Sequence, residues 1–390
     1  MTIEGLNNFI NKKYPNLKNE ISINKFTGKR IAIDFYNWMY CNYQSVYSSA
    51  VDGTDIINET IDNYAIEKMY LSNLIKFIIK WASNQITPII ILDGKEKDMK
   101  SKTHIKRKVK RTKILHEIEE LYKLLEDKMK DDILEPIDHI TIKIKTKLKS
   151  LAKIPKKIIE LSIDFFKSIG IPCIEAKGDA EKLCAILCRE KIVAGVFSKD
   201  IDCLAFGSPI MLKEFSKTKN KTPLLVCLKL DQVLEEFKMS FNEFLDFCIL
   251  CGCDYNDKID GLGPIGAYKQ IFDNKRIENI DSKYDYTPLN HEVIRNEFKI
   301  ISSNDLIYLR HSNFQSDNLY EIQKIQNLEL FDEYELDNEL IFLVKTLNYL
   351  IRYNQPGHSI EINYDAIKEI ELSELKQRKA APKKALKKKV

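Results

Sequence analysis

Two aspartates stand one residue apart in FSKDIDCLAFG, residues 197–207. Asp200 and Asp202 follow the apolar run VAGVF, whose length and composition are typical of a buried strand. Their like charges repel each other, and burying a carboxylate costs on the order of several kcal/mol unless a cation compensates its charge. The spacing therefore predicts a cation bound between the two side chains.

Five further acids occupy similar positions in the sequence. They lie at the ends of RIAID and TPIIILD, in the helix that follows IPCIEA, and after the helix SFNEFLDFCILCG: Asp34, Asp93, Asp179, Glu181 and Asp254. A single acid in such a position is usually a turn former or a helix cap. Several at one sheet edge cannot all be ionised without divalent cations, and oxygen-only ligands favour Mg²⁺ or Mn²⁺ over zinc. Two such ions about 4 Å apart hold the attacking and leaving oxygens of a phosphodiester.

The elements that must position these acids alternate between strand and helix patterns. Strands are predicted at KRIAIDF, TPIIILD, IPCIEA, VAGVF, PIMLKEF and PLLVCLKL, with amphipathic helices between the first four. Ser240 and Glu243 form a capping box before the helix that follows the last strand. Residues 95 to about 150 are lysine-rich and helix-forming, which predicts a helical insertion. The alternation predicts a mostly parallel sheet with its ligands at the carboxyl ends of the strands.

Composition restricts the class of protein. The 390 residues are 44% hydrophobic and 30% charged, which is typical of a soluble chain of one large or two smaller domains. No apolar run is long enough to span a bilayer, and the N-terminus lacks the apolar core of a signal peptide, so we expect an intracellular protein without a membrane partner. The nine cysteines are expected to be reduced thiols. Cys248, Cys251 and Cys253 lack a fourth ligand at a zinc-like spacing, so a core role is favoured over zinc binding.

Two basic blocks stand out against a net charge of only +4. Residues 100–113 and 376–390 each contain eight Lys or Arg and no acid. Such blocks attract polyanions, although a solvated helix face and a disordered tail are the simpler alternatives. The end of the second block, PKKALKKKV, is also similar to a nuclear import signal.

Six segments in order carry a family resemblance: MTIEGLNNFI, KRIAIDFYNWMY, TPIIILDGK, GIPCIEAKGDAEKLCA, FSKDIDCLAFGSP and FCILCGCDYNDKIDGLGPIGA. Together they resemble the flap endonucleases, structure-specific 5′ nucleases that include the xeroderma pigmentosum group G nuclease. The match covers residues 1 to about 272. It implies an α/β fold with a PIN-like, mostly parallel sheet flanked by helices, a helical arch insertion and a helix–two-turn–helix motif that binds DNA.

The resemblance implies a role for each acid. Asp34, Asp93, Asp179, Glu181, Asp200, Asp202 and Asp254 match the acids that hold two Mg²⁺ ions, with Mn²⁺ as a substitute. Asp179 departs from the family, which usually has Glu at this place, and its shorter side chain is expected to reach the ion either directly or through a water. Lys100 and Arg107 match the two catalytic cations of the arch. Seven residues separate them, so about two helical turns place both on one face.

The resemblance also implies a DNA-binding surface. Tyr40 matches an aromatic residue that stacks on a base beside the scissile phosphate, although a core position in its helix is an alternative. Gly261 and Gly263, in DGLGPIGA, match hairpin glycines whose amides approach a DNA phosphate. Lys258 replaces a serine that binds potassium in the family. Its ammonium is expected to fill that cation site, or at least to repel the ion. The alternative is that Lys258 points to solvent and the hairpin carbonyls bind potassium without the serine.

The expected activity is Mg²⁺-dependent hydrolysis of branched DNA that carries a 5′ flap, near a single-strand/duplex junction, in DNA replication and repair. Two alternatives stay open: a 5′–3′ exonuclease or Holliday-junction resolvase of the same superfamily, and a DNA-binding scaffold without catalytic activity. The sequence contains no sliding-clamp box of the usual form, a Gln followed by an aliphatic and two aromatic residues, so a clamp partner is not indicated. We expect a monomer in the nucleus, or in the cytoplasm if the protein is viral.

These assignments divide the chain as follows: residues 1–95 an N-terminal nuclease region, 96–150 the arch, 151–256 an internal nuclease region, 257–275 the helix–two-turn–helix motif, 276–370 a C-terminal helical region, and 371–390 a basic disordered tail.

Overall fold

The α/β alternation predicted from the sequence is present in the computed structural model. The structure describes residues 3–94, 101–130, 137–216, 222–256, 258–280 and 284–299, and parts of 334–347. The chain divides into two units, Met1–Leu350 and Ile351–Val390, and the second, which includes the basic tail, lies outside the described residues.

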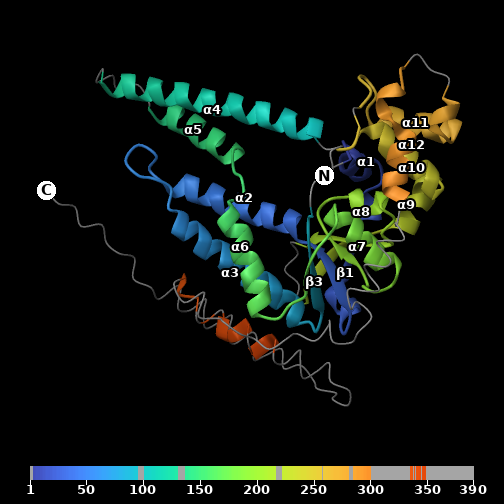
Figure 1. Ribbon diagram of the computed structural model, residues 1–390, viewed down its shortest axis with the longest axis horizontal. Coiled ribbons are helices and arrows are strands. Elements are labelled where there is room, and N and C mark those ends of the chain that lie inside the picture. Colours follow the sequence, from blue (N-terminus) through green and yellow to red (C-terminus); the bar gives the residue numbers. More distant parts are fainter. Residues whose placement is uncertain are drawn as a thin grey trace. The chain divides into compact units, whose positions relative to one another are not determined.

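A sheet with strand order β1-β7-β6-β5-β2-β3-β4 is the centre of the first unit (Figure 1). The strands that pair in parallel are β2 (Arg30–Asp34), β3 (Thr87–Leu92), β4 (Cys173–Glu175), β5 (Val196–Phe197) and β6 (Ile210–Phe215). Two antiparallel strands, β7 (Leu224–Lys229) and β1 (Asn19–Ser22), extend the sheet beyond β6. The mostly parallel sheet is therefore confirmed. Because β5, β2, β3 and β4 are consecutive neighbours, the residues after them meet at one edge.

Successive side chains of a strand face opposite sides of the sheet, and different helices pack on each side. Val196 packs in the cluster beneath α7 (Ala180–Arg189), whereas the next residue, Phe197, contacts Phe77 and Trp81 of α3 (Asn63–Ala82). The helices α2 (Phe35–Gly53) and α6 (Lys156–Ser168) join α3, since Trp38 stacks on Phe77 and Phe35 meets Phe166. The period of two along a strand thus buries both faces of the sheet.

The lysine-rich segment forms a hairpin of two helices, α4 (Ser101–Lys130) and α5 (Asp138–Ser150), as expected for a helical insertion. Leu125, Ile140 and Ile144 form its small apolar core, and Ile56 from the segment after α2 packs against it. The hairpin is attached to α2 by polar contacts: Gln44 donates to the carbonyl of Lys149 at 2.8 Å, and Lys149 pairs with Asp52. The apolar core and these contacts position α4 and α5 relative to α2.

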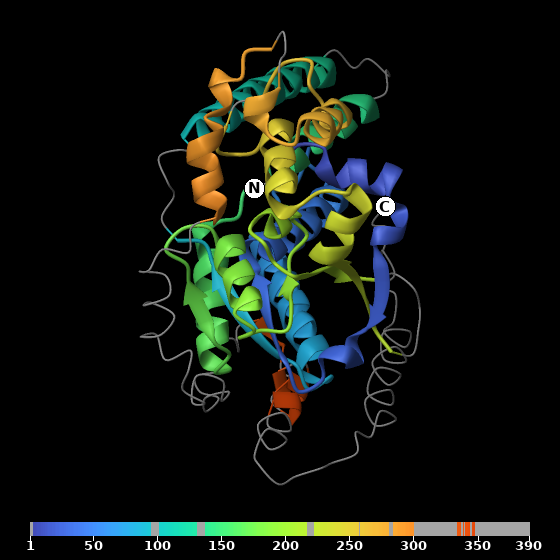
Figure 2. The ribbon, with the colours of Figure 1, turned by 90° about the vertical axis from the view of Figure 1, so that its right-hand side faces the viewer.

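A second helical group follows the sheet: α10 (Phe241–Cys251), α11 (Pro264–Asn274) and α12 (His291–Lys299) lie together (Figures 1 and 2). The capping box of Ser240 and Glu243 opens α10, as predicted. The group shares its core with α1 (Leu6–Lys13), α8 (Asp202–Ala205) and α9 (Leu230–Phe237). Through α8 this core reaches the segment that contains Asp202.

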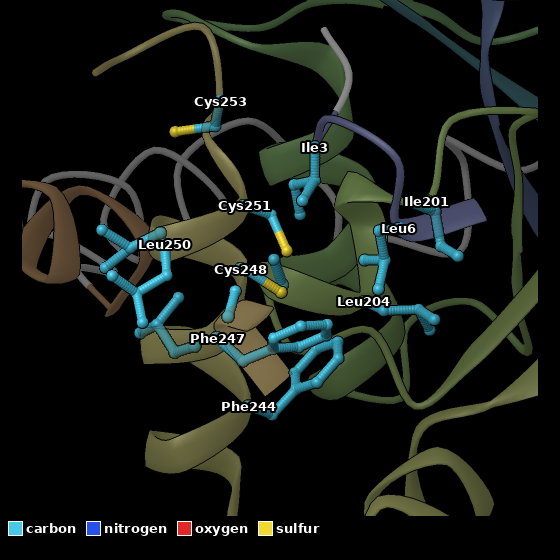
Figure 3. Close-up of a cluster of buried hydrophobic side chains, with 14 of the residues drawn as sticks. Ile3, Leu6, Ile201, Leu204, Phe244, Phe247, Cys248, Leu250, Cys251 and Cys253 are labelled. Carbon is cyan, nitrogen blue, oxygen red and sulfur yellow. The ribbon is translucent and has the colours of Figure 1, made fainter. Parts of the chain in front are cut away.

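The three clustered cysteines belong to this core. Cys248, Cys251 and Cys253 are buried among apolar side chains that include Ile3 and Leu204 (Figure 3). In the part of the chain that the structure describes, they belong to no group of His, Cys, Asp and Glu close enough to hold a metal. Core packing of these thiols is thus confirmed.

Among the described helices, none is both long enough and apolar enough for a membrane span.

Candidate active site

Ser198 joins the ends of β2 and β5. Its hydroxyl donates to Asp34 Oδ2 at 2.7 Å and accepts the amide N–H of Asp200 at 3.0 Å. Asp34 ends β2 and caps α2, where its Oδ1 accepts the N–H of Asn37. Sequence reasoning missed Ser198, although a hydroxyl between a strand and the Asp200–Asp202 pair was a visible signal. Its two hydrogen bonds fix the segments that carry Asp34 and Asp200.

Asp202 is fully buried and accepts a hydrogen bond from the N-terminal segment. Its Oδ1 accepts the amide N–H of Ile3 at 2.8 Å, and its own N–H donates to Asp200 Oδ1 at 3.3 Å. Among the described residues, its Oδ2 has no hydrogen-bond partner. A buried acceptor without a donor costs free energy, so this oxygen requires another partner. A cation would supply it.

A second group of acids lies at the ends of β3 and β4. The carboxylates of Asp93, Asp179 and Glu181 each place one oxygen within 4.8 Å of the other two. Asp93 follows β3, and its Oδ1 accepts the N–H of Ala180 at 2.9 Å, which ties it to the start of α7. Asp179 and Glu181 are buried, whereas Asp93 is exposed. Three acids that are distant in sequence are therefore within reach of one ion.

The two groups of acids act on each other electrostatically. Burial raises the pKa of Asp34 to about 7, and the charges of Asp93 and Asp200 add to the shift. Burial raises the pKa of Glu181 well above its usual range, and the charges of Asp34, Asp93 and Asp200 add to the shift. The pKa of Asp202 is also raised, by burial and by Asp200. These shifts show that the carboxylate form is unfavourable here without positive charge, which agrees with the predicted cation site.

The metal-free protein should lose stability as the pH rises. The pKa of Asp34 is about 7 in the folded protein but about 4 in an unfolded chain, so the folded state binds more protons between these values. Its contribution to the free energy of unfolding is present below about pH 4 and falls by on the order of a few kcal/mol as the pH approaches 7. Urea unfolding in EDTA at pH 5 and pH 8, compared with Asp34→Asn, measures this slope. A slope unchanged by the substitution would contradict the assignment, and Mg²⁺ should flatten the slope of the unmodified protein.

Gly94 allows the close approach of β3 and β4 next to these acids. A Cβ added at Gly94 would lie 1.8 Å from the carbonyl oxygen of Ala176, and the Gly94 N–H donates to the carbonyl of Gly178 at 2.9 Å. We expect Gly94→Ala to separate Asp93 from Asp179 and to destabilise the protein by about 1–3 kcal/mol. Urea unfolding measures the loss, with Gly53→Ala, where the added Cβ would enter open space, as the control. Equal stability of the two variants would contradict the close approach.

The seventh predicted acid, Asp254, lies half-buried in the segment after α10. Its neighbour Tyr255 donates a hydrogen bond from its hydroxyl to Asp179 Oδ2. This contact brings the end of α10 to the start of α7, where the second acid group lies. The participation of Asp254 in the cluster stays a prediction, and Tyr255 is a contact that sequence reasoning missed.

The predicted DNA-binding residues have the exposure that contact with DNA requires. Tyr40 of α2 is 47% exposed, so the alternative of a core position is wrong. Gly261 adopts a φ of +79°, and no atom occupies the space where a Cβ would stand at Gly261 or Gly263. Gly263 is the N-cap of α11, which begins at Pro264. The start of α11 is thus open to a phosphate.

Of the three cationic side chains predicted to act at the site, the structure describes only that of Lys258. Lys100 lies outside the described residues, and Arg107 belongs to α4, but its side chain is not among those described. The ammonium of Lys258 donates to Glu4 Oε2 at 2.7 Å. This pairing gives Lys258 a carboxylate partner at an exposed position. That its ammonium fills a cation site among hairpin carbonyls stays a prediction.

Comparison with known proteins identifies the family. The XPG N-terminal domain model matches residues 1–114, and the XPG I-region model matches residues 170–254. Flap endonuclease 1 of Glycine max is 31% identical over 280 residues, which are 72% of this chain and 68% of that protein. The chain belongs to the flap endonuclease family.

Two further comparisons give a longer sequence match and a match of the fold. Flap endonuclease 1 of Cryptosporidium muris is 29% identical over 383 residues, covering 94% of this chain and 75% of that protein. The flap endonuclease structure from Methanococcus jannaschii matches the fold with a TM-score of 0.56 at 22% identity, over 87% of this chain and 97% of that chain. The chain spans from 47% to 75% of the length of the flap endonuclease 1 sequences compared with it. The fold predicted from the resemblance is therefore that of its family.

Proposed function

We propose that this chain hydrolyses a phosphodiester bond near the junction of branched DNA that carries a 5′ flap, with two divalent cations, Mg²⁺ in the cell. The observation that carries this proposal is the convergence of acids from separate strand ends. Three of them, Asp93, Asp179 and Glu181, offer oxygens within 4.8 Å of one another in a member of the flap endonuclease family.

The donor set fits hard divalent cations. All its side-chain ligands are carboxylates, which favour Mg²⁺ or Mn²⁺, and the buried Oδ2 of Asp202 has no hydrogen-bond partner among the described residues. The residues that would hold the ions are Asp34, Asp93, Asp179, Glu181, Asp200, Asp202 and Asp254. When bound, two such ions supply Lewis acidity and stabilise both the attacking and the leaving oxygen of the phosphodiester.

The surrounding residues would bind and orient the DNA. Tyr40 presents an exposed ring six residues after Asp34, the N-cap of α2, where it can stack on a base. The amides at the start of α11 would hold a duplex phosphate without reading sequence. Lys100 and Arg107 would draw the scissile phosphate to the carboxylates and stabilise the charge that develops on it. With these contacts the protein would select its substrate by the shape of the DNA rather than by its base sequence.

A panel of labelled substrates tests the proposal: a 5′ flap, a double flap, a nicked duplex and a four-way junction, each in Mg²⁺ and in EDTA. We expect one main cut near the base of the flap and no product in EDTA. A ladder of mononucleotides would favour the exonuclease, and paired nicks in the four-way junction would favour the resolvase. Binding to the flap without cleavage in Mg²⁺ would contradict the proposed activity and support a DNA-binding scaffold.

A further inference from the structure

Tyr255 contacts both the second group of acids (Asp93, Asp179 and Glu181) and helix α12. Its ring is 7% exposed, and its hydroxyl donates to Asp179 Oδ2. The ring of Phe298, from α12, meets the Tyr255 ring edge-on with 5.8 Å between the centroids. The hydroxyl is therefore directed at Asp179 by a ring that is itself packed in place.

The helix that carries Phe298 is anchored by a buried ion pair. Arg295, one turn before Phe298 on α12, donates through Nη2 to Asp246 Oδ2 of α10 at 2.6 Å and also pairs with Glu278. Both Arg295 and Asp246 are buried, and Asp246 Oδ2 also accepts the N–H of Ile277 at 3.2 Å. Arg295 thus fixes α12 to α10, and with it the position of Phe298 against Tyr255.

Asp179 has a short side chain, and its orientation determines whether its carboxylate reaches the ion. It stands where the family resemblance implies a glutamate, so its carboxylate lies one methylene closer to its backbone. A carboxylate that binds a metal depends on partners outside the ligand set to fix its orientation, and losing such a partner typically reduces metal affinity or activity by about 10–100-fold. The Tyr255 hydroxyl is in the position of such a partner.

We propose that Tyr255 is a positioning residue. Its hydroxyl holds the Asp179 carboxylate toward the ion that Asp93 and Glu181 would share. This inference rests on the proposed function, because it takes Asp179 to be part of the metal site, directly or through a water. It assigns α12 a part in catalysis, as the support of Tyr255.

The test is Mn²⁺ binding to the free protein, measured by electron paramagnetic resonance without DNA or turnover. Tyr255→Phe removes the hydroxyl and keeps the ring that packs on Phe298. We expect the Kd of the weakened Mn²⁺ site to rise by about 10–100-fold, and the Mg²⁺ concentration that gives half-maximal flap cleavage to rise with it.

Tyr70→Phe is the matched control. The hydroxyl of Tyr70 is also buried, at 2.7 Å from Ser162 Oγ, in the packing of α3 against α6. Its loss should lower the unfolding temperature without changing Mn²⁺ affinity. If Tyr255→Phe behaves in the same way, Tyr255 has only a structural role and the inference is wrong.

A double-mutant cycle with Asp179→Asn shows whether Tyr255 acts through Asp179. If it does, Tyr255→Phe causes less than threefold further loss of Mn²⁺ affinity in the Asp179→Asn background, whereas a full additional loss would overturn the inference. Phe298→Leu serves if Tyr255→Phe does not fold. It should weaken Mn²⁺ binding at least threefold, and unchanged affinity would count against the inference. Absence of Mn²⁺ binding by the unmodified protein would instead overturn the proposed function.

Discussion

Replacing Asp200 by asparagine is expected to reduce single-turnover cleavage of a 5′-flap substrate by on the order of a thousandfold, while the substrate still binds. Asp200 is buried, receives the N–H of Asp202, and lies next to Ser198 at the end of β5. Asparagine has the same shape and can accept the same hydrogen bond. It carries no charge, so the site would lose a ligand without losing its fold.

The binding measurement distinguishes this effect from misfolding. Affinity for the flap, measured by fluorescence anisotropy in EDTA, should stay equal or increase, because removing a negative charge lessens the repulsion of phosphates. Asp231→Asn, at an exposed position of α9, is the control and should cleave normally. Turnover of Asp200→Asn within tenfold of the unmodified protein would show that Asp200 is not part of the active site.

Replacing Lys100 or Arg107 by alanine is expected to slow single-turnover cleavage by on the order of tenfold to a thousandfold, with a much smaller change in affinity. Seven carboxylates and two divalent cations leave a net negative site, so a phosphate reaches it more easily when cations flank its path. Loss of one cation should therefore raise the barrier of the chemical step more than it weakens binding.

Lys123→Ala is the control for the arch, because Lys123 is exposed on the same helix, more than four turns after Arg107. It should change neither the cleavage rate nor the salt dependence of binding by much. If Lys100→Ala and Arg107→Ala lower affinity and leave the rate of the bound complex unchanged, the arch only steers the DNA toward the site.

The acids could be predicted from the sequence because their positions follow from the topology of the sheet. Asp34 and Asp93 come at the ends of short apolar runs that are typical of buried strands, and parallel strands bring their carboxyl ends to one edge. The two helices of the lysine-rich segment, α4 and α5, were predictable for a related reason, since the helix-forming residues there offer no strand pattern. For these strands and helices, the local sequence pattern agrees with the observed fold.

The contacts that orient the acids could not be predicted in this way. The bond from Ser198 to Asp34 joins residues 164 positions apart, and that from Tyr255 to Asp179 joins residues 76 apart. Such bonds depend on how segments meet in space and leave no periodic signal. The strand β5 is also short, Val196–Phe197, so the run VAGVF indicated its place but not its length.

Anomalous scattering from crystals of the protein with Mn²⁺ and flap DNA tests the central claim most directly, because it locates the ions without relying on activity. Two peaks about 4 Å apart are predicted at the carboxyl edge of β5, β2, β3 and β4, one within ligand distance of Asp202 Oδ2 and one near Asp93 and Glu181. Peaks only at other sites, with Asp202 and Glu181 bound to no ion, would contradict a two-metal nuclease site.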